Sequence, residues 1–294
     1  MLSNQVINSY RFASGGDSWS TAYDNSILAG GAKPAWTAHD DAMKFVSGTW
    51  SNITALPADR QLLQGGGNSD NGIMIAGDAA GTSYPEPDVY GYDGSSWSAL
   101  ASISHDNMMM AGGGNTTDAF WAGGTYSALD DCQTFNGTTW TTQNTLTHGT
   151  RGCIGSGKSD GAWCMGGYAG SAVYEVWNQQ WDGTNWSDSS TDCPTARFYS
   201  YNGGSGLPTS AIVSQNEAST GGCYMFDGSA FSLTGDTNYN RNYRMVGGDS
   251  VNAIKCGGSV DGELTEYYDS STWQTTGDMT IDDLYASGAG GNTV

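Results

Sequence analysis

The chain has 294 residues and a formal net charge of −20, and its 44 glycines are about twice the average usage. Its 11 Trp, 16 Tyr and 7 Phe argue against disorder, the glycines have no period of three as in collagen, and no apolar run is long enough for a membrane-spanning helix. The acidic balance argues against nucleic acids and anionic membranes as partners, since both attract clustered Lys and Arg.

The N-terminal segment lacks the basic and apolar regions of a secretory signal. We therefore expect no signal peptide. Residues 1–9 are assigned to an arm or an extra strand, and residues 10–294 to a single repeat domain.

An aromatic or apolar residue, a turn and a second aromatic recur along the chain at intervals of 42 to 47 residues. Asp-Gly and Asn-Gly pairs in these turns, such as Asp93-Gly94 and Asn136-Gly137, favour a positive φ and predict tight β-hairpins. The closing aromatics, which we expect to be structural, are Trp50, Trp97, Trp140, Trp186, Phe231 and Trp273.

Two further phrases precede each hairpin. One is a short apolar strand that ends in glycine, as in residues 27–31 and 119–124, and the other is a glycine-rich opening strand, as in residues 63–67 and 110–114. Each repeat therefore predicts four short strands, with the hairpin between the third and the fourth. Four strands every 40–50 residues are typical of a β-propeller blade, and blades must stack in a ring to bury both faces of each sheet.

These phrases resemble kelch repeats, in which a Gly-Gly pair ends the second strand, an aromatic lies in the third and a Trp in the fourth. The resemblance covers roughly residues 10–294. The low charge and the turns rich in Ser, Thr and Asn are similar to degenerate kelch-type repeats in structural proteins of bacteriophages, especially marine ones. The resemblance implies an all-β propeller in a virion protein.

Six hairpin aromatics predict six blades. Residues 284–291 match the opening strand of a blade, so we expect the C-terminal strand to complete the blade begun at the N-terminus and to close the ring. Residues 10–19 look like a further hairpin phrase, which leaves seven blades as an alternative. Only 31 residues separate this phrase from Trp50, too few for a complete blade.

Motifs for catalysis and metal binding are missing from the sequence. It has no Gly-x-Ser-x-Gly elbow and no Gly-x-x-x-x-Gly-Lys loop, and its six cysteines and three histidines show no zinc spacing. We therefore expect no catalytic residue, no cofactor and no metal. The cysteines are expected to be buried thiols, with disulfides as the alternative.

The loops between the second and third strands should share one face of a propeller with the loops between blades. Aromatic rings beside polar groups suit sugars and protein partners, so this face is the candidate binding surface. The candidate binding residues are Trp36, Tyr84, Tyr126, Tyr168, His105, His148 and Arg197, and the same loops carry Asp59, Arg60, Asp106, Arg151 and Arg241. The alternative is that the aromatics only cover the ends of the blade core.

A propeller without a second domain is a rigid interaction disc, and its function does not follow from its fold. The first hypothesis is a non-enzymatic structural or accessory protein of a phage virion, in the capsid decoration or the tail fibre, with other virion proteins and a host surface glycan or protein as partners. The second is a lectin-like, carbohydrate-binding propeller. A glycan-active enzyme is the third.

Overall fold

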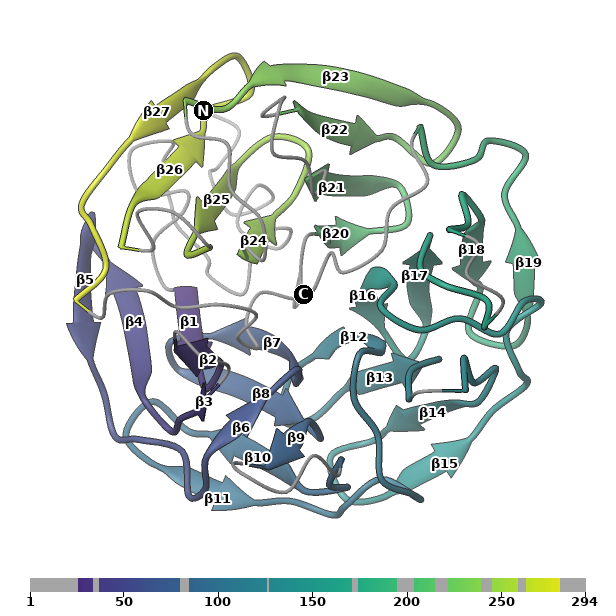
Figure 1. Ribbon diagram of the computed structural model, residues 1–294, viewed down its shortest axis with the longest axis horizontal. Coiled ribbons are helices and arrows are strands. Elements are labelled where there is room, and N and C mark those ends of the chain that lie inside the picture. The colour runs from purple at the N-terminus through teal and green to yellow at the C-terminus, as the bar shows by residue number, and fades with distance from the viewer. Residues whose placement is uncertain are drawn as a thin grey trace, which may run out of the picture.

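Six antiparallel β-sheets follow one another around a common axis in the computed structural model, as Figure 1 shows. The structure describes residues 26–33, 37–79, 85–125, 127–170, 174–194, 204–214, 222–238, 245–258 and 263–280. The second to sixth sheets have four strands each, and the first has three among the described residues. The predicted all-β propeller and its count of six blades are thereby confirmed. Within the described ranges there is no helix long and apolar enough to cross a membrane.

The strands of each blade are neighbours both in the sequence and in the sheet. The first three blades consist of β1 (Ser26–Ala29), β4 (Ala42–Val46) and β5 (Thr49–Asn52); of β7 (Gln64–Asn68), β8 (Asn71–Ile75), β10 (Val89–Tyr92) and β11 (Trp97–Ala99); and of β12 (Ala111–Gly114), β13 (Ala119–Ala122), β14 (Cys132–Phe135) and β15 (Trp140–Thr142).

The other three blades repeat this order. They consist of β16 (Ile154–Lys158), β17 (Gly161–Met165), β18 (Asn178–Trp181) and β19 (Trp186–Asp188); of β20 (Gly204–Leu207), β21 (Ser210–Ser214), β22 (Gly222–Phe226) and β23 (Phe231–Asp236); and of β24 (Met245–Gly248), β25 (Ala253–Cys256), β26 (Thr265–Tyr268) and β27 (Trp273–Thr275). Two short ribbons, β2 (Ala32–Lys33) with β3 (Thr37–Ala38) and β6 (Arg60–Gln61) with β9 (Asp78–Ala79), lie outside the blades.

The two ends of the ring differ in the connections they carry, because antiparallel strands alternate in direction. We call the end with the loops between second and third strands and the loops between blades the loop face. The opposite end, with the turns between first and second strands and the hairpins between third and fourth strands, is the turn face. The prediction that the two kinds of loop share one face is confirmed by isolated bridges such as those from His39 to Arg60 and from Arg151 to Tyr168.

Glycine in the first strand of each four-stranded blade allows the strands next to the axis to approach closely (Figure 1). A Cβ atom on Gly66 would lie 2.4 Å from the carbonyl oxygen of Gly114 in the next blade. Gly114 has a φ of +107°, and a Cβ atom there would lie 2.2 Å from the Asp118 carbonyl oxygen. Any side chain at these positions would therefore separate neighbouring blades or distort the turn.

Every hairpin of the repeat is flanked by a pair of aromatic rings. The paired rings, with centroids 4.6 to 5.7 Å apart, are Phe45 with Trp50, Tyr92 with Trp97, Phe135 with Trp140, Trp181 with Trp186, Phe226 with Phe231 and Tyr268 with Trp273. Four of the predicted closing aromatics are buried, and Trp140 and Phe231 are half-buried. Their packing holds the outer two strands of each blade together.

Hydrogen bonds from four of the closing tryptophans, Trp50, Trp97, Trp140 and Trp273, link their blades to the preceding one. Trp97 Nε1 donates to the Thr54 carbonyl at 2.9 Å, and Trp273 Nε1 donates to Thr234 Oγ1 at 3.1 Å. Trp50 Nε1 of the first blade donates to Thr265 Oγ1 of the sixth blade at 3.0 Å. The first and last blades therefore meet like any other pair.

Residues after the last strand also contact the first blade. Thr280 Oγ1 donates to Met43 Sδ at 3.1 Å and to Asn52 Oδ1, and Met279 is buried in the same hydrophobic cluster as Phe45 and Trp50. The ring is therefore closed. The predicted closing strand at residues 284–291, the arm at residues 1–9 and the seventh hairpin phrase at residues 10–19 lie outside the described residues.

Side-chain carboxylates and amides close the hairpins on the turn face. Asp93 Oδ1 accepts hydrogen bonds from the backbone N–H groups of Ser95 and Ser96 at 2.9 and 2.8 Å. The equivalent residues are Asn136, Asp182, Asp227 and Asp269. The turns are thus four-residue loops with an internal cap, and the first blade alone among the six has the two-residue hairpin, at Ser47-Gly48.

All six cysteines are free and buried, which confirms the prediction of buried thiols over disulfides. Cys132, Cys153 and Cys164 share one hydrophobic cluster between the third and fourth blades. Burial raises the pKa of the Cys132 thiol to about 12, so the thiol stays protonated near neutral pH.

Candidate binding face

Three of the seven predicted binding residues are described by the structure: Tyr168, His105 and His148. All three lie on the loop face, His105 and His148 in the loops that enter the third and fourth blades and Tyr168 in the loop after β17. Trp36, Tyr84, Tyr126 and Arg197 lie outside the described residues, as does Arg241. The fourth blade therefore carries the best-described part of the predicted surface.

His148 is held between an aromatic ring and a carboxylate. Its imidazole stacks on the Trp177 ring with centroids 4.1 Å apart and an interplanar angle of 17°. Its Nε2 atom lies 3.1 Å from Asp188 Oδ2, and Thr147 Oγ1 donates to the other oxygen of the same carboxylate at 2.5 Å. Since the His148 and Asp188 side chains are 36% and 51% exposed, the pair lies at the surface and can contact a ligand.

His105 occupies the equivalent place in the third blade but packs differently. Its ring meets Trp121 edge-on at 5.2 Å, and its Nδ1 atom lies 3.0 Å from Ser104 Oγ. Its Nε2 atom is 3.8 Å from Asp131 Oδ2, beyond hydrogen-bond distance. Trp121 is fully buried, so His105 covers the end of the blade core. The His105 side chain is 36% exposed, as is that of His148, so a binding role and a core-covering role both stay predictions for it.

In the third, fourth and sixth blades a buried glutamine or glutamate holds the preceding loop by hydrogen bonds. The sequence alone did not predict this role. Gln179 Oε1 accepts hydrogen bonds from His148 N and Thr147 Oγ1, each at 2.8 Å, and its Nε2 atom donates to the His148 carbonyl. Gln133 accepts from Ser104 N at 3.1 Å, and Glu266 accepts from Asn238 N at 2.6 Å. The sequence does contain a signal for this role, because each of the three is the second residue of the third strand in its blade.

Arg151 and two tyrosines form the second part of the surface on the fourth blade. The Arg151 guanidinium lies over the Tyr168 ring, 4.7 Å from its centroid. Tyr168 meets Tyr174 edge to face at 6.3 Å, and Tyr174 is 52% exposed. We call Arg151, Tyr168 and Tyr174 the aromatic patch. An exposed ring next to a stacked cation offers both apolar contact and polar edges.

Arg60, which the sequence also placed on this face, has a structural role instead. It is only 5% exposed, and its Nη2 atom donates to Asp88 Oδ2 at 2.7 Å. A second guanidinium nitrogen donates to the Asp59 carbonyl oxygen. The side chain therefore joins the loop before the second blade to the start of β10 and is not offered to a ligand.

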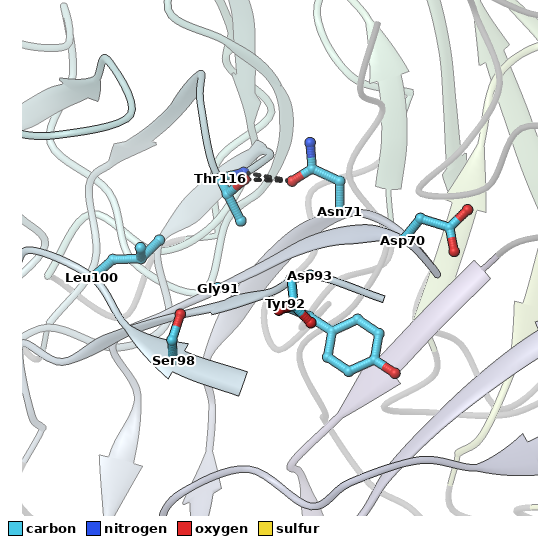
Figure 2. A pocket seen from close by; sticks show the side chains of 8 residues that line it. All are labelled: Asp70, Asn71, Gly91, Tyr92, Asp93, Ser98, Leu100 and Thr116. Atoms are coloured by element: carbon cyan, nitrogen blue, oxygen red, sulfur yellow. Dashed lines mark hydrogen bonds between the residues drawn. The ribbon is translucent and has the colours of Figure 1, made fainter. Parts of the chain in front are cut away.

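A cavity of about 400 Å³ opens on the other end of the ring, between the second and third blades (Figure 2). Asn71 Oδ1 spans this boundary by accepting hydrogen bonds from Thr116 N and Thr116 Oγ1 at 3.1 and 2.6 Å. The lining residues are Asp70, Asn71, Gly91, Tyr92, Asp93, Ser98, Leu100 and Thr116. The backbone N–H of Ser96 and the Ser95 hydroxyl hold the pKa of Asp93 down at about 2, so this carboxylate is ionised near neutral pH.

No group of three or more His, Cys, Asp or Glu side chains that could hold a metal ion occurs in the part of the chain that the structure describes. No protein-family model matches the chain, and no curated protein is significantly similar to it.

Proposed function

We propose that this chain is a non-enzymatic structural or accessory protein of a bacteriophage virion, a disc that presents its loop face to another virion protein or to the host surface. The proposal rests on the kelch-type repeat phrases and their similarity to phage structural proteins. The aromatic patch is the observation that supports a contact role, because Tyr174 is exposed and its ring meets Tyr168, over which the Arg151 guanidinium lies.

The architecture suits such a role. Close contacts at inner-strand glycines and tryptophan hydrogen bonds between several of the blades form a close-packed scaffold that carries the loops. Capped, hydroxyl-rich turns on the opposite face, together with the net charge of −20, limit nonspecific association.

Quantitative mass spectrometry of gradient-purified phage particles tests the proposal. We expect the chain at a fixed copy number relative to the major capsid protein, and we expect it to persist through a salt wash. Detection only in the soluble lysate would overturn the virion assignment.

A lectin-like role is the second candidate, and the stacked rings on the fourth blade favour it. Tyr174 and the His148–Trp177 pair offer ring faces and edges beside the polar Asp188, a combination that binds sugars. A glycan array with the wild-type protein and the Tyr174→Ala variant tests this role. Saturable signals that the variant loses support it, and signals that the variant keeps contradict it.

A further inference from the structure

The cavity between the second and third blades lies beside the one position of the repeat that carries no side chain. The third strand of each blade has a residue that pairs with the residue directly after the closing aromatic of the fourth strand, and in β10 this residue is Gly91, paired with Ser98. The equivalent residues of the other blades are Lys44, Thr134, Gln180, Met225 and Tyr267. The second blade is thus the one member of the ring with no side chain here.

The fifth blade shows how a side chain packs at the position equivalent to Gly91. Met225 of the fifth blade packs into the cluster that joins it to Val246 and Tyr268 of the sixth. At Gly91, a Cβ atom would already lie 2.8 Å from Thr116 Cγ2 of the third blade and 3.0 Å from Leu100 Cδ1. These two side chains therefore pack over the bare backbone at Gly91 and form an apolar wall of the cavity, as Figure 2 shows.

Polar groups from several elements also line the cavity. Ser98 on β11 is exposed, and in Figure 2 its hydroxyl points toward the space beside Gly91. Asp70 comes from the turn before β8 and Asp93 from the hairpin after β10. Asp93 Oδ1 is occupied by the turn, while its Oδ2 atom accepts no hydrogen bond from a described residue. The cavity therefore offers acceptors and a hydroxyl group on one side and carbon atoms on the other.

We propose that this cavity binds a neutral saccharide unit. The cavity volume of about 400 Å³ falls within the range of about 300–1,000 Å³ that is typical of small-molecule sites. Two carboxylates with no Lys or Arg among the lining residues disfavour an anionic ligand. Neighbouring hydroxyl groups of a sugar can donate to Asp70 and Asp93 and accept from Ser98, while the C–H face of the ring packs on Leu100 and Thr116.

The site lies on the turn face, whereas the aromatic patch lies on the loop face, so the inference does not depend on the proposed function. A virion protein can carry this site or lack it. Absence of the chain from particles would leave the saccharide site standing, and failure to bind sugars would leave the virion assignment standing.

Saturation-transfer NMR with methyl glucoside, methyl galactoside, methyl mannoside and N-acetylglucosamine tests the proposal on the full chain. We expect saturable binding of at least one of these probes with a dissociation constant of about 1 mM, the range expected for a shallow site. Ser98→Ala should weaken this binding about tenfold. Gly91→Thr introduces the residue type that the third blade has at the equivalent position, Thr134. The new side chain should block the cavity and abolish binding.

Ser187→Ala is the matched control, because Ser187 occupies the same position in β19 but pairs with Gln180 rather than with a glycine. It should bind the probe as the wild type does. If Gly91→Thr does not fold, the comparison of Ser98→Ala with Ser187→Ala decides. Binding of none of the four sugars, equal binding by the two serine variants, or preferential binding of butylammonium that salt abolishes would each overturn the proposal.

Discussion

Single glycines determine how closely the blades of this ring can approach one another. Gly114 combines a left-handed backbone conformation with backbone atoms on both sides, since Asp118 O and the Ala119 Cα atom would lie 2.2 and 2.4 Å from an added Cβ. Left-handed strain and overpacking each cost about 1–3 kcal/mol. The glycine richness of the sequence is therefore a packing requirement at specific positions rather than a sign of flexibility.

We predict that Gly114→Ala lowers the free energy of unfolding by at least about 2 kcal/mol, measured by urea denaturation. Gly161→Ala is the control, because nothing lies within 4 Å of a Cβ atom there, and we expect a change within about 0.5 kcal/mol. Equal effects of the two substitutions would contradict the packing argument.

Thiol chemistry offers a second test at the residue scale. Because all six cysteines are buried and burial raises the pKa of Cys132, we expect almost no alkylation by iodoacetamide in the native protein at pH 8. In guanidinium chloride all six should react, as counted by intact-protein mass spectrometry. Rapid native labelling of any cysteine would show that the blade interior is open.

Hairpin turns are the elements most sensitive to pH. Hydrogen bonds from Ser96 and Ser95 lower the pKa of Asp93 to about 2, and similar caps lower the pKa of Asp182, Asp227 and Asp269. An unfolded aspartate has a pKa of about 3.9, so below this value the unfolded state binds more protons than the folded state. The stabilisation from these carboxylates is therefore complete above about pH 4 and is lost as the pH falls toward 2.

A variant with Asn in place of Asp93, Asp182, Asp227 and Asp269 tests this prediction, because Asn136 already caps the equivalent turn of the third blade. We expect the variant to resemble the wild type at pH 7 in thermal unfolding. Between pH 4 and pH 2 its melting temperature should fall less steeply. An unchanged acid slope would show that other carboxylates dominate acid unfolding.

The elements of each blade were predictable because they repeat. Six aromatic pairs, glycine-ended strands and Asx turns recur at nearly constant spacing, which identified the hairpins and the blade count from the sequence. Contacts that depend on a residue of another strand or blade were not predictable in this way. Gln179 was missed because its partners His148 and Thr147 lie 31 and 32 residues away. The same holds for the cavity at Gly91, where an absent side chain matters only once Thr116 is placed beside it.

The loops that carry the described part of the candidate surface were predictable, whereas the binding role of their residues stays a prediction. Alternation of strand direction correctly placed His105, His148 and Tyr168 on one face. It could not distinguish His148, stacked on Trp177 beside an exposed carboxylate, from His105, which covers the buried Trp121. The sequence also could not show that Arg60 pairs with Asp88, because that pair forms only after the loop folds against β10.

Closure is the property of the whole molecule that turns six sheets into one disc. The bond from Trp50 to Thr265 joins residues 215 positions apart and is the counterpart of the bonds between consecutive blades. A ring has no exposed first or last blade face, so its blades should unfold together rather than one at a time.

We predict energetic coupling between Trp50 and Thr265. In a double-mutant cycle with Trp50→Phe and Thr265→Val, the coupling energy should be about 0.5–1 kcal/mol, since each substitution removes the same hydrogen bond. Trp97→Phe combined with Thr265→Val is the control and should be additive, because Trp97 donates to the Thr54 carbonyl instead. Additivity in both cycles would argue that the first and sixth blades do not meet in solution.

The most direct test of the whole account is a cryo-EM reconstruction of purified phage particles that resolves this chain. We predict a closed six-bladed ring that touches its neighbour, on the particle or on an adsorbed host surface, through the loop face of the fourth blade around Tyr174. A ring attached through its turn face, or particles without the chain, would contradict it.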